Sequence, residues 1–117
     1  MKQKLSGVEA EELVPGTGAE AIKGSIVTVH VVFKLRRGDT VRSTYEAGTP
    51  DTFRIGSRNV IAGLEQGVVG MRVGGKRRLR ISPHLAYRHV GAPGIPPNAL
   101  LICEVELLLV DTSAGTP

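Results

Sequence analysis

The chain has 117 residues, a single cysteine and a formal net charge of +4, and 41% of its residues are hydrophobic. This length is typical of one domain, and the apolar content is sufficient for a buried core. One cysteine excludes an intramolecular disulfide, which favours a reducing compartment and predicts a cytoplasmic location. No apolar run has the length of a signal peptide or a transmembrane helix, so we expect no membrane partner.

The first part of the chain has the alternating pattern of β-strands. We expect residues 1–7 to be disordered, a strand over 9–14 and a longer strand beginning at Ser25. Successive side chains of a strand point to opposite faces of its sheet. On the longer strand this predicts one face made of Val27, Val29 and Val31 and another made of Thr28, His30 and Val32.

Turn residues divide the next segment. Gly38, between Arg37 and Asp39, predicts a hairpin turn. The return strand is expected to begin at Val41, to break over 47–50 and to continue over 53–55.

One short helix follows this hairpin. Apolar residues at spacings of three and four share one helical face, and here they are Val60, Ile61, Leu64 and Val68. We expect Asn59 to cap a helix that begins at Val60, and Gly70 to end it. So short a helix is unstable alone, so its apolar face must pack on the strands.

Two more strands complete the expected fold. Over 76–81, basic residues alternate with Leu79 and Ile81. Over 100–110, one face is predicted to hold Leu101, Cys103, Val105, Leu107 and Leu109, opposite Glu104 and Glu106. One helix among many strands predicts an α+β domain over 8–111, with an antiparallel β-sheet wrapped around one short α-helix and a polar C-terminal tail over 112–117.

The sequence does not contain a recognisable catalytic or metal motif. The three histidines lack metal-ligand spacing, so neither a metal nor a cofactor is predicted. Cys103 lies on an apolar face, where an inert buried thiol is the usual case. The basic residues over 76–81 have the period of a solvated strand face and no aromatic stacking partners, so we expect no nucleic-acid partner.

A set of motifs carries a family resemblance. They are Val60-Ile61, Gly67-Val68, Met71 with Val73-Gly74, Ile81-Ser82-Pro83, Ala86-Tyr87 and Ile95-Pro96-Pro97. In order and approximate spacing they resemble the FKBP family of macrolide-binding peptidyl-prolyl cis-trans isomerases, over residues 14–110. The resemblance implies a sheet wrapped around the helix, and proline-containing polypeptides as partners of a monomer.

Prolyl isomerisation would explain why the sequence contains no catalytic or metal motif. Rotation about an X–Pro bond breaks no covalent bond, so it needs an apolar pocket complementary to the twisted imide and not an acid–base pair. The resemblance implies two catalytic donors, the backbone N–H of Ile61 and the hydroxyl of Tyr87. It also implies the substrate-binding residues Val31, Val41, Arg42, Phe53, Val60, Leu64, Ile95 and Cys103.

The implied pocket departs from the family's aromatic pattern. Val31, Val41, Leu64 and Cys103 stand where the family has aromatic residues, Arg42 where it has aspartate, and Ala92 where some members have histidine. We expect Arg42 to reach towards Glu46 or Glu104 and, with the missing aromatics, to weaken isomerase activity and disfavour macrolide binding. Two hypotheses follow: an isomerase of FKBP type acting on X–Pro bonds, or a non-catalytic FKBP-like module that binds a protein partner or prolyl segment or acts as a chaperone.

Overall fold

The computed structural model describes residues 2–5, 7–88 and 91–112. They form strands and short helices in the order β1 (Lys2–Leu5), β2 (Val8–Val14), β3 (Ile26–Leu35), β4 (Thr40–Ser43), α1 (Thr44–Ala47), β5 (Asp51–Arg54), α2 (Ala62–Val68), β6 (Lys76–Ile81), the 3-10 turn η1 (Pro83–Leu85) and β7 (Leu101–Asp111). Among these described residues, no helix is long and apolar enough to cross a membrane.

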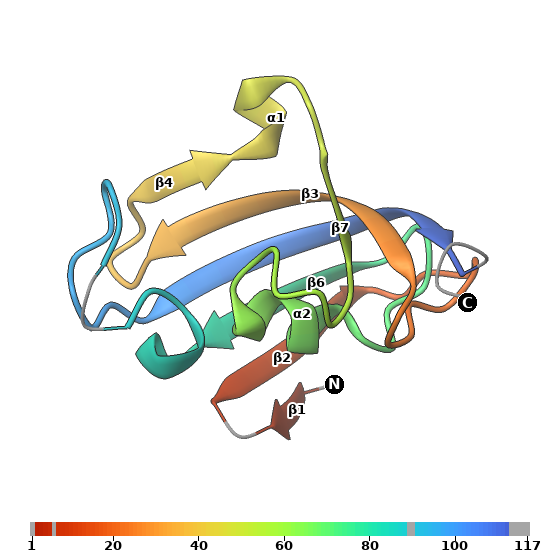
Figure 1. The fold of residues 1–117 in the computed structure, drawn as a ribbon, viewed down its shortest axis with the longest axis horizontal. Helices are drawn as coiled ribbons and strands as arrows, with labels where there is room; N and C mark the ends of the chain where they lie inside the picture. Colours follow the sequence, from red (N-terminus) through yellow and green to blue (C-terminus); the bar gives the residue numbers. More distant parts are fainter. Residues whose placement is uncertain (1, 6, 89–90, 113–117) are drawn as a thin grey trace.

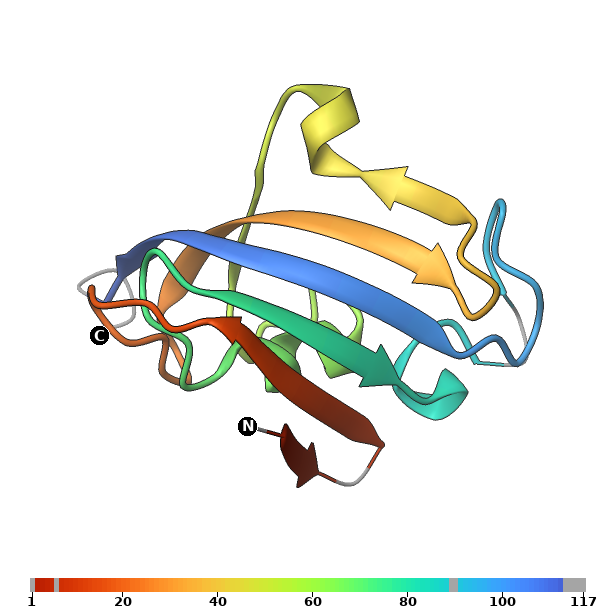
Figure 2. The same ribbon diagram turned by 180° about the vertical axis from the view of Figure 1, so that it is seen from behind.

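The strands make one antiparallel sheet. Their order is β1-β2-β6-β7-β3-β4, and β5 pairs with β3 beyond the end of β4. Figures 1 and 2 show the sheet curving around α2, with β3, β7 and β6 crossing it side by side. The predicted fold class, an antiparallel sheet wrapped around a short helix, is therefore confirmed.

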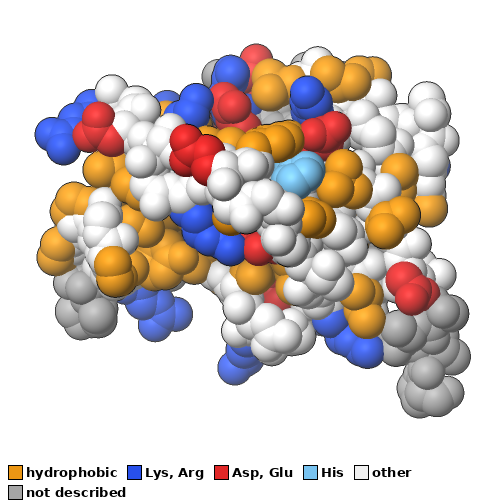
Figure 3. Space-filling view, turned by 90° about the horizontal axis from the view of Figure 1, so that it is seen from above, with side chains coloured by type: hydrophobic (Ala, Val, Ile, Leu, Met, Phe, Trp, Pro, Cys, Tyr) orange, Lys and Arg blue, Asp and Glu red, His pale blue; other side chains and the backbone are white. Residues whose placement is uncertain are grey.

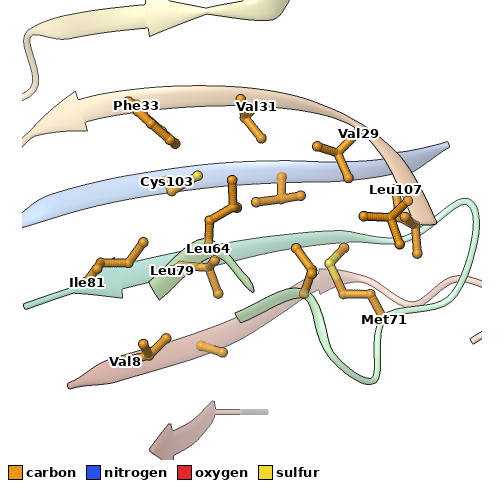
Figure 4. Close-up of a cluster of buried hydrophobic side chains, with 14 of the residues drawn as sticks. Val8, Val29, Val31, Phe33, Leu64, Met71, Leu79, Ile81, Cys103 and Leu107 are labelled. Carbon is orange, nitrogen blue, oxygen red and sulfur yellow. The ribbon is translucent and has the colours of Figure 1, made fainter. Parts of the chain in front are cut away.

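The core lies between α2 and the concave face of the sheet. Val29, Val31, Leu79 and Leu107 of the strands are fully buried, and Leu64 of the helix is 1% exposed. Figure 4 shows these side chains pointing into the space between the helix and the strands. The apolar faces predicted for the helix and for β3 therefore stabilise the fold by packing on each other.

The face predicted for β7 is correct except at its end. Leu101, Cys103, Val105 and Leu107 are buried, whereas Leu109 is 64% exposed. The pairing with β3 shifts in register between Thr28 and Val29, which are opposite Leu109 and Leu107. A bulge of this kind ends the strict alternation of faces, which the sequence pattern did not reveal.

The helix begins later than predicted. α2 starts at Ala62 with Ile61 as its N-cap, and no side chain caps it, so the predictions of a start at Val60 and a cap by Asn59 are wrong. The N–H groups of Leu64 and Glu65 both bond to the Ile61 carbonyl. Gly70 has φ +89° directly after the helix, as expected of a left-handed stop.

The return strand ends earlier than predicted because a second short helix follows it. Ser43 Oγ accepts the N–H of Glu46, and Gly48 closes α1 with φ +79°. Thr44 is 1% exposed, and its Oγ1 accepts the N–H of Val31 at 2.8 Å. This hydroxyl ties α1 to β3 and moves the chain away from the sheet before it returns as β5.

The N-terminus also differs from the prediction. We expected residues 1–7 to be disordered, but Lys2–Leu5 form β1 and pair with β2. The domain limits 8–111 stay a prediction, and most of the expected polar tail, 113–117, lies outside the described residues.

Candidate functional site

A pocket of about 320 Å³ opens beside the start of α2. Residues of β3, β4, β5 and α2, the segment before α2 and the turn after η1 line it: Phe33, Arg42, Asp51, Thr52, Phe53, Asn59, Val60, Ile61, Leu64 and Tyr87. Segments distant in sequence meet here because β5 returns to pair with the first residues of β3, Ile26–Val29, before the chain enters the helix.

The structure brings most of the implied site residues together. Arg42, Phe53, Val60, Ile61, Leu64 and Tyr87 all line this pocket. Their roles in binding and catalysis, however, stay predictions that the shared location supports.

Four implied residues do not line the pocket. Val31 and Cys103 are fully buried in the core beneath it. Cys103 is opposite Phe33 in the β3–β7 pairing, and it is Phe33 that contributes to the pocket wall. Ile95 is 8% exposed within the core cluster, and Val41 packs against that cluster. These four contribute to the packing that supports the site and not to the lining itself.

Ile61 presents a free donor at the pocket floor. Its carbonyl accepts the first helical hydrogen bonds, but its own N–H has no acceptor among the described residues. The first N–H groups of a helix are unpaired within the helix, so a ligand carbonyl can satisfy them. The position of Ile61 as the N-cap of α2 therefore makes it a candidate carbonyl-binding group.

Glu65 holds the segment that leads to this donor. It is 8% exposed, and its Oε2 accepts the N–H of Gly56 at 3.1 Å and that of Arg58 at 3.0 Å. Gly56 and Arg58 both have positive φ, 100° and 67°. The carboxylate thus pins a tight turn immediately before Asn59 and Val60. The sequence analysis missed this role, although an acid in a first helical turn often bonds back to the chain before the helix.

Tyr87 supplies the second donor. It is half-buried, and its backbone carbonyl accepts the N–H of Gly91 at 3.0 Å. Tyr87 lines the pocket, and its hydroxyl has no hydrogen-bond partner among the described residues. A phenolic hydroxyl in this position can donate to a ligand oxygen.

Arg42 forms an ion pair that the sequence analysis did not predict. Its Nη1 and Nη2 donate to the two oxygens of Asp51 at 2.6 and 2.8 Å. The expected partners are wrong, since Glu104 pairs with Arg78 and Lys34 and no ion pair joins Arg42 to Glu46. Hydrogen bonding to Asp51 raises the pKa of Arg42 despite partial burial, so the guanidinium stays charged. Asp51 was missed because the α1 excursion separates it from Arg42 in sequence.

Other reactive groups lie outside the pocket. Burial raises the pKa of the Cys103 thiol, as expected for an inert core cysteine. His30 Nδ1 lies 2.9 Å from Thr44 Oγ1, and its ring stacks on Tyr45. Within the described ranges, no group of His, Cys, Asp and Glu side chains has the geometry of a metal site.

Sequence comparisons agree with this geometry. The model of the family described as FKBP-type peptidyl-prolyl cis-trans isomerase matches residues 18–108. The chain is 51% identical over 104 residues to FK506-binding protein 4 of Dictyostelium discoideum, covering 88% of this chain and 28% of that protein. It is 43% identical over 115 residues to the chloroplastic peptidyl-prolyl cis-trans isomerase FKBP13 of Arabidopsis thaliana, covering 88% of this chain and 55% of that protein. The chain thus spans about a quarter to a half of these relatives.

Solved structures show the same fold. The crystal structure of AtFKBP13 superposes with a TM-score of 0.83 at 41% identity, covering 89% of this chain and 93% of that chain. The crystal structure of FkpA from Escherichia coli superposes with a TM-score of 0.85 at 35% identity, covering 94% of this chain and 51% of that chain.

Proposed function

Because this chain belongs to the family of FKBP-type peptidyl-prolyl cis-trans isomerases, we propose that it catalyses cis–trans isomerisation of X–Pro bonds in polypeptides. The observation that carries this proposal is the pocket itself. It combines an apolar floor with two donors that have no acceptor among the described residues, the Ile61 N–H and the Tyr87 hydroxyl.

The physical task is to lower a rotational barrier. Amide resonance makes that barrier roughly 18–20 kcal/mol for an ordinary peptide bond. A charge-separated resonance form stabilises the planar amide, and an apolar environment disfavours that form, which favours the twisted imide by comparison. Binding the twisted form more tightly than either planar isomer accelerates the exchange in both directions.

Each group of the pocket has a part in this mechanism. Val60, Leu64 and Phe53 provide the apolar surface on which the prolyl ring would lie. The Ile61 N–H and the Tyr87 hydroxyl would bind carbonyls on either side of the rotating bond and hold the peptide while it turns. No proton is transferred, in keeping with a pocket whose titratable groups are Arg42, Asp51 and Tyr87.

Magnetisation exchange on an Ala-Leu-Pro-Phe peptide tests the proposal directly. The wild-type chain should accelerate exchange between the cis and trans peptide. Tyr87→Phe should lower kcat/KM about fivefold, the worth of one hydrogen bond of about 1 kcal/mol. Tyr45→Phe is the matched control, since Tyr45 lies outside the pocket on α1. Unchanged exchange with wild-type protein at a saturating peptide concentration would overturn the proposal.

The Arg42–Asp51 pair favours a second candidate function. It makes part of the wall polar where an aromatic wall would hold a macrolide or prolyl ring more tightly. A non-catalytic module that binds a protein partner through this pocket would perturb Ile61 and Tyr87 resonances with a prolyl peptide yet leave the exchange rate unchanged. We expect weak macrolide binding under both functions.

We further propose that the chain acts as a cytoplasmic monomer. The buried Cys103, free of a disulfide, suits a reducing compartment. One relative is named as chloroplastic, so location must be read from imaging of the tagged full-length protein. Sedimentation at several concentrations measures the oligomeric state.

A further inference from the structure

Arg42 lies in the pocket wall with unused hydrogen-bond donors. A guanidinium has five N–H donors, and Asp51 accepts one from Nη1 and one from Nη2. No other acceptor for Arg42 is present among the described residues, and its side chain is 47% exposed. The remaining N–H groups are therefore available to a ligand in the pocket.

The orientation of this guanidinium is fixed before a ligand arrives. The bidentate contact with Asp51 holds its plane, and the Phe33 ring lies under Cζ at 5.8 Å from the ring centre. A planar guanidinium presents parallel N–H groups that match the two oxygens of a carboxylate. Because Asp51 and Phe33 immobilise the group, a ligand carboxylate would lose little free energy in ordering it.

Two more arginines are sequence neighbours of residues that line the pocket. Arg58 precedes Asn59 and Arg88 follows Tyr87, and both arginines are exposed. Their side chains make no ion pair with a described residue. Their backbones are anchored, with the Arg58 N–H on Glu65 and the Arg88 N–H on the Pro83 carbonyl at 2.9 Å. The backbone of each arginine is therefore held in place next to a residue that lines the pocket.

The acidic groups near the pocket are already paired. Among the lining residues the one carboxylate is Asp51, which Arg42 neutralises. Figure 3 shows basic side chains in blue, acidic ones in red and hydrophobic ones in orange interspersed on the face seen from above. On the outer face of the sheet, by contrast, Arg78 is balanced by both Glu11 and Glu104. Unlike Arg78, Arg58 and Arg88 have no ion-pair partner among the described residues.

We propose that this pocket selects X–Pro bonds that have an aspartate or glutamate next to the proline. Arg42 binds the carboxylate through its unused N–H groups, and Arg58 and Arg88 attract it to the mouth. This specificity rests on the proposed isomerase function, which it refines by naming an acidic substrate class. A lysine in the same place would have the same charge as Arg58 and Arg88 and be disfavoured.

The test is a peptide series, Ala-Xaa-Pro-Phe and Ala-Leu-Pro-Xaa, in which Xaa is Glu, Gln or Lys. Magnetisation exchange gives kcat/KM, and titration of the Ile61 and Tyr87 amide resonances gives Kd independently of turnover. In at least one of the two series, we expect kcat/KM about fivefold higher for Glu than for Gln, the upper range for a partly exposed ion pair. The ratio should fall towards one between about 0.02 M and about 0.5 M salt, because screening weakens exposed charges.

Variants assign the preference to particular side chains. The double variant Arg42→Gln with Asp51→Asn removes both charges and keeps a neutral hydrogen-bonding pair, and it should abolish most of the Glu preference. Arg58→Gln with Arg88→Gln should reduce it in low salt only. Arg36→Gln, in the exposed turn after β3, is the control and should leave it intact.

The outcomes separate the specificity from the activity. Equal kcat/KM and equal Kd for Glu and Gln peptides in both series would overturn the acidic preference while leaving an isomerase in place. If no peptide is turned over, the proposed function fails, and the Kd values still decide whether the pocket prefers a carboxylate. An undiminished preference in the Arg42/Asp51 double variant would also overturn the proposal.

Discussion

The carboxylate of Glu65 and the backbone N–H of Arg58 are joined by a hydrogen bond of 3.0 Å across the entry to α2. The same oxygen accepts the N–H of Gly56, so one buried side chain holds both ends of the turn. The turn leads to Val60 and Ile61, which line the pocket floor. The shape of that floor thus depends on a residue that does not line it.

Replacing Glu65 should therefore disturb both stability and activity. Glu65→Ala leaves two backbone N–H groups without their acceptor, and we expect a loss of roughly 1–3 kcal/mol in the free energy of unfolding. Glu65→Gln keeps an acceptor oxygen and should lose less than half as much. Urea unfolding measures the first effect, and kcat/KM at a temperature where each variant is folded measures the second. Equal losses for Ala and Gln would contradict the role of the acceptor.

Restoring the family's aromatic residues should have opposite effects at two positions. Val31 is fully buried in the core, so Val31→Tyr should overpack it and lower stability by roughly 1–3 kcal/mol. Leu64 is 1% exposed like the core residues, but it borders the pocket, so a larger ring at Leu64→Trp can extend towards the pocket. We expect this variant to stay folded and to turn over the prolyl peptide faster. The melting temperature and kcat/KM of each variant measure these effects. A Val31→Tyr protein as stable as wild type and more active would refute the assignment of Val31 to the core.

Arg42→Asp should weaken the pocket and not restore it. From the sequence, this change appeared to return the family's carboxylate. In the structure it would place a second carboxylate beside Asp51, and like charges at this separation repel. We expect lower stability at pH 7 that recovers as the pH falls and one carboxylate binds a proton. The free energy of unfolding of the variant and of wild type, measured between about pH 4 and pH 7, tests this. A difference between them that does not change with pH would contradict it.

Arg77 should contribute far more stability than the other arginines of the surface. It is 8% exposed, and it donates to Glu12 and to the carbonyls of Gly67 and Val69 at the end of α2. Arg77→Met should cost about 3 kcal/mol, since removing one partner of a buried pair leaves the others unsatisfied. The control Arg72→Met breaks an exposed pair with Glu20 and should cost under about 1 kcal/mol. Similar losses in both variants would contradict this role.

Tyr45 should make the fold sensitive to alkali. Partial burial and the hydrogen bond to Glu106 raise its pKa to about 12. The unfolded chain releases this proton near an ordinary tyrosine pKa of about 10, whereas the folded chain keeps it. The contribution of Tyr45 to the free energy of unfolding is therefore fully present below about pH 10. It is lost as the pH rises towards about 12. Tyr45→Phe should show a shallower decline in that window, measured by urea unfolding, and an unchanged slope would refute the linkage.

The sequence by itself determined the class of fold and the main elements of the pocket. Alternation along β3 and β7 specified which side chains face the core, because a strand has a period of two. The motif at Val60-Ile61 and the tyrosine at 87 named two candidate donors whose residues both line one pocket, while their roles stay predictions. These features are encoded locally or by family resemblance, so they needed no knowledge of long-range contacts.

Only the tertiary structure decided the features that depend on distant partners. Arg42 meets Asp51 because α1 lifts the chain off the sheet and returns it as β5, a path that no local pattern describes. Leu109 leaves the core because a bulge shifts the β3–β7 register. Arg77 is buried because the end of α2 supplies its acceptors. In each case the free energy of the side chain is set by a neighbour that the fold brings close.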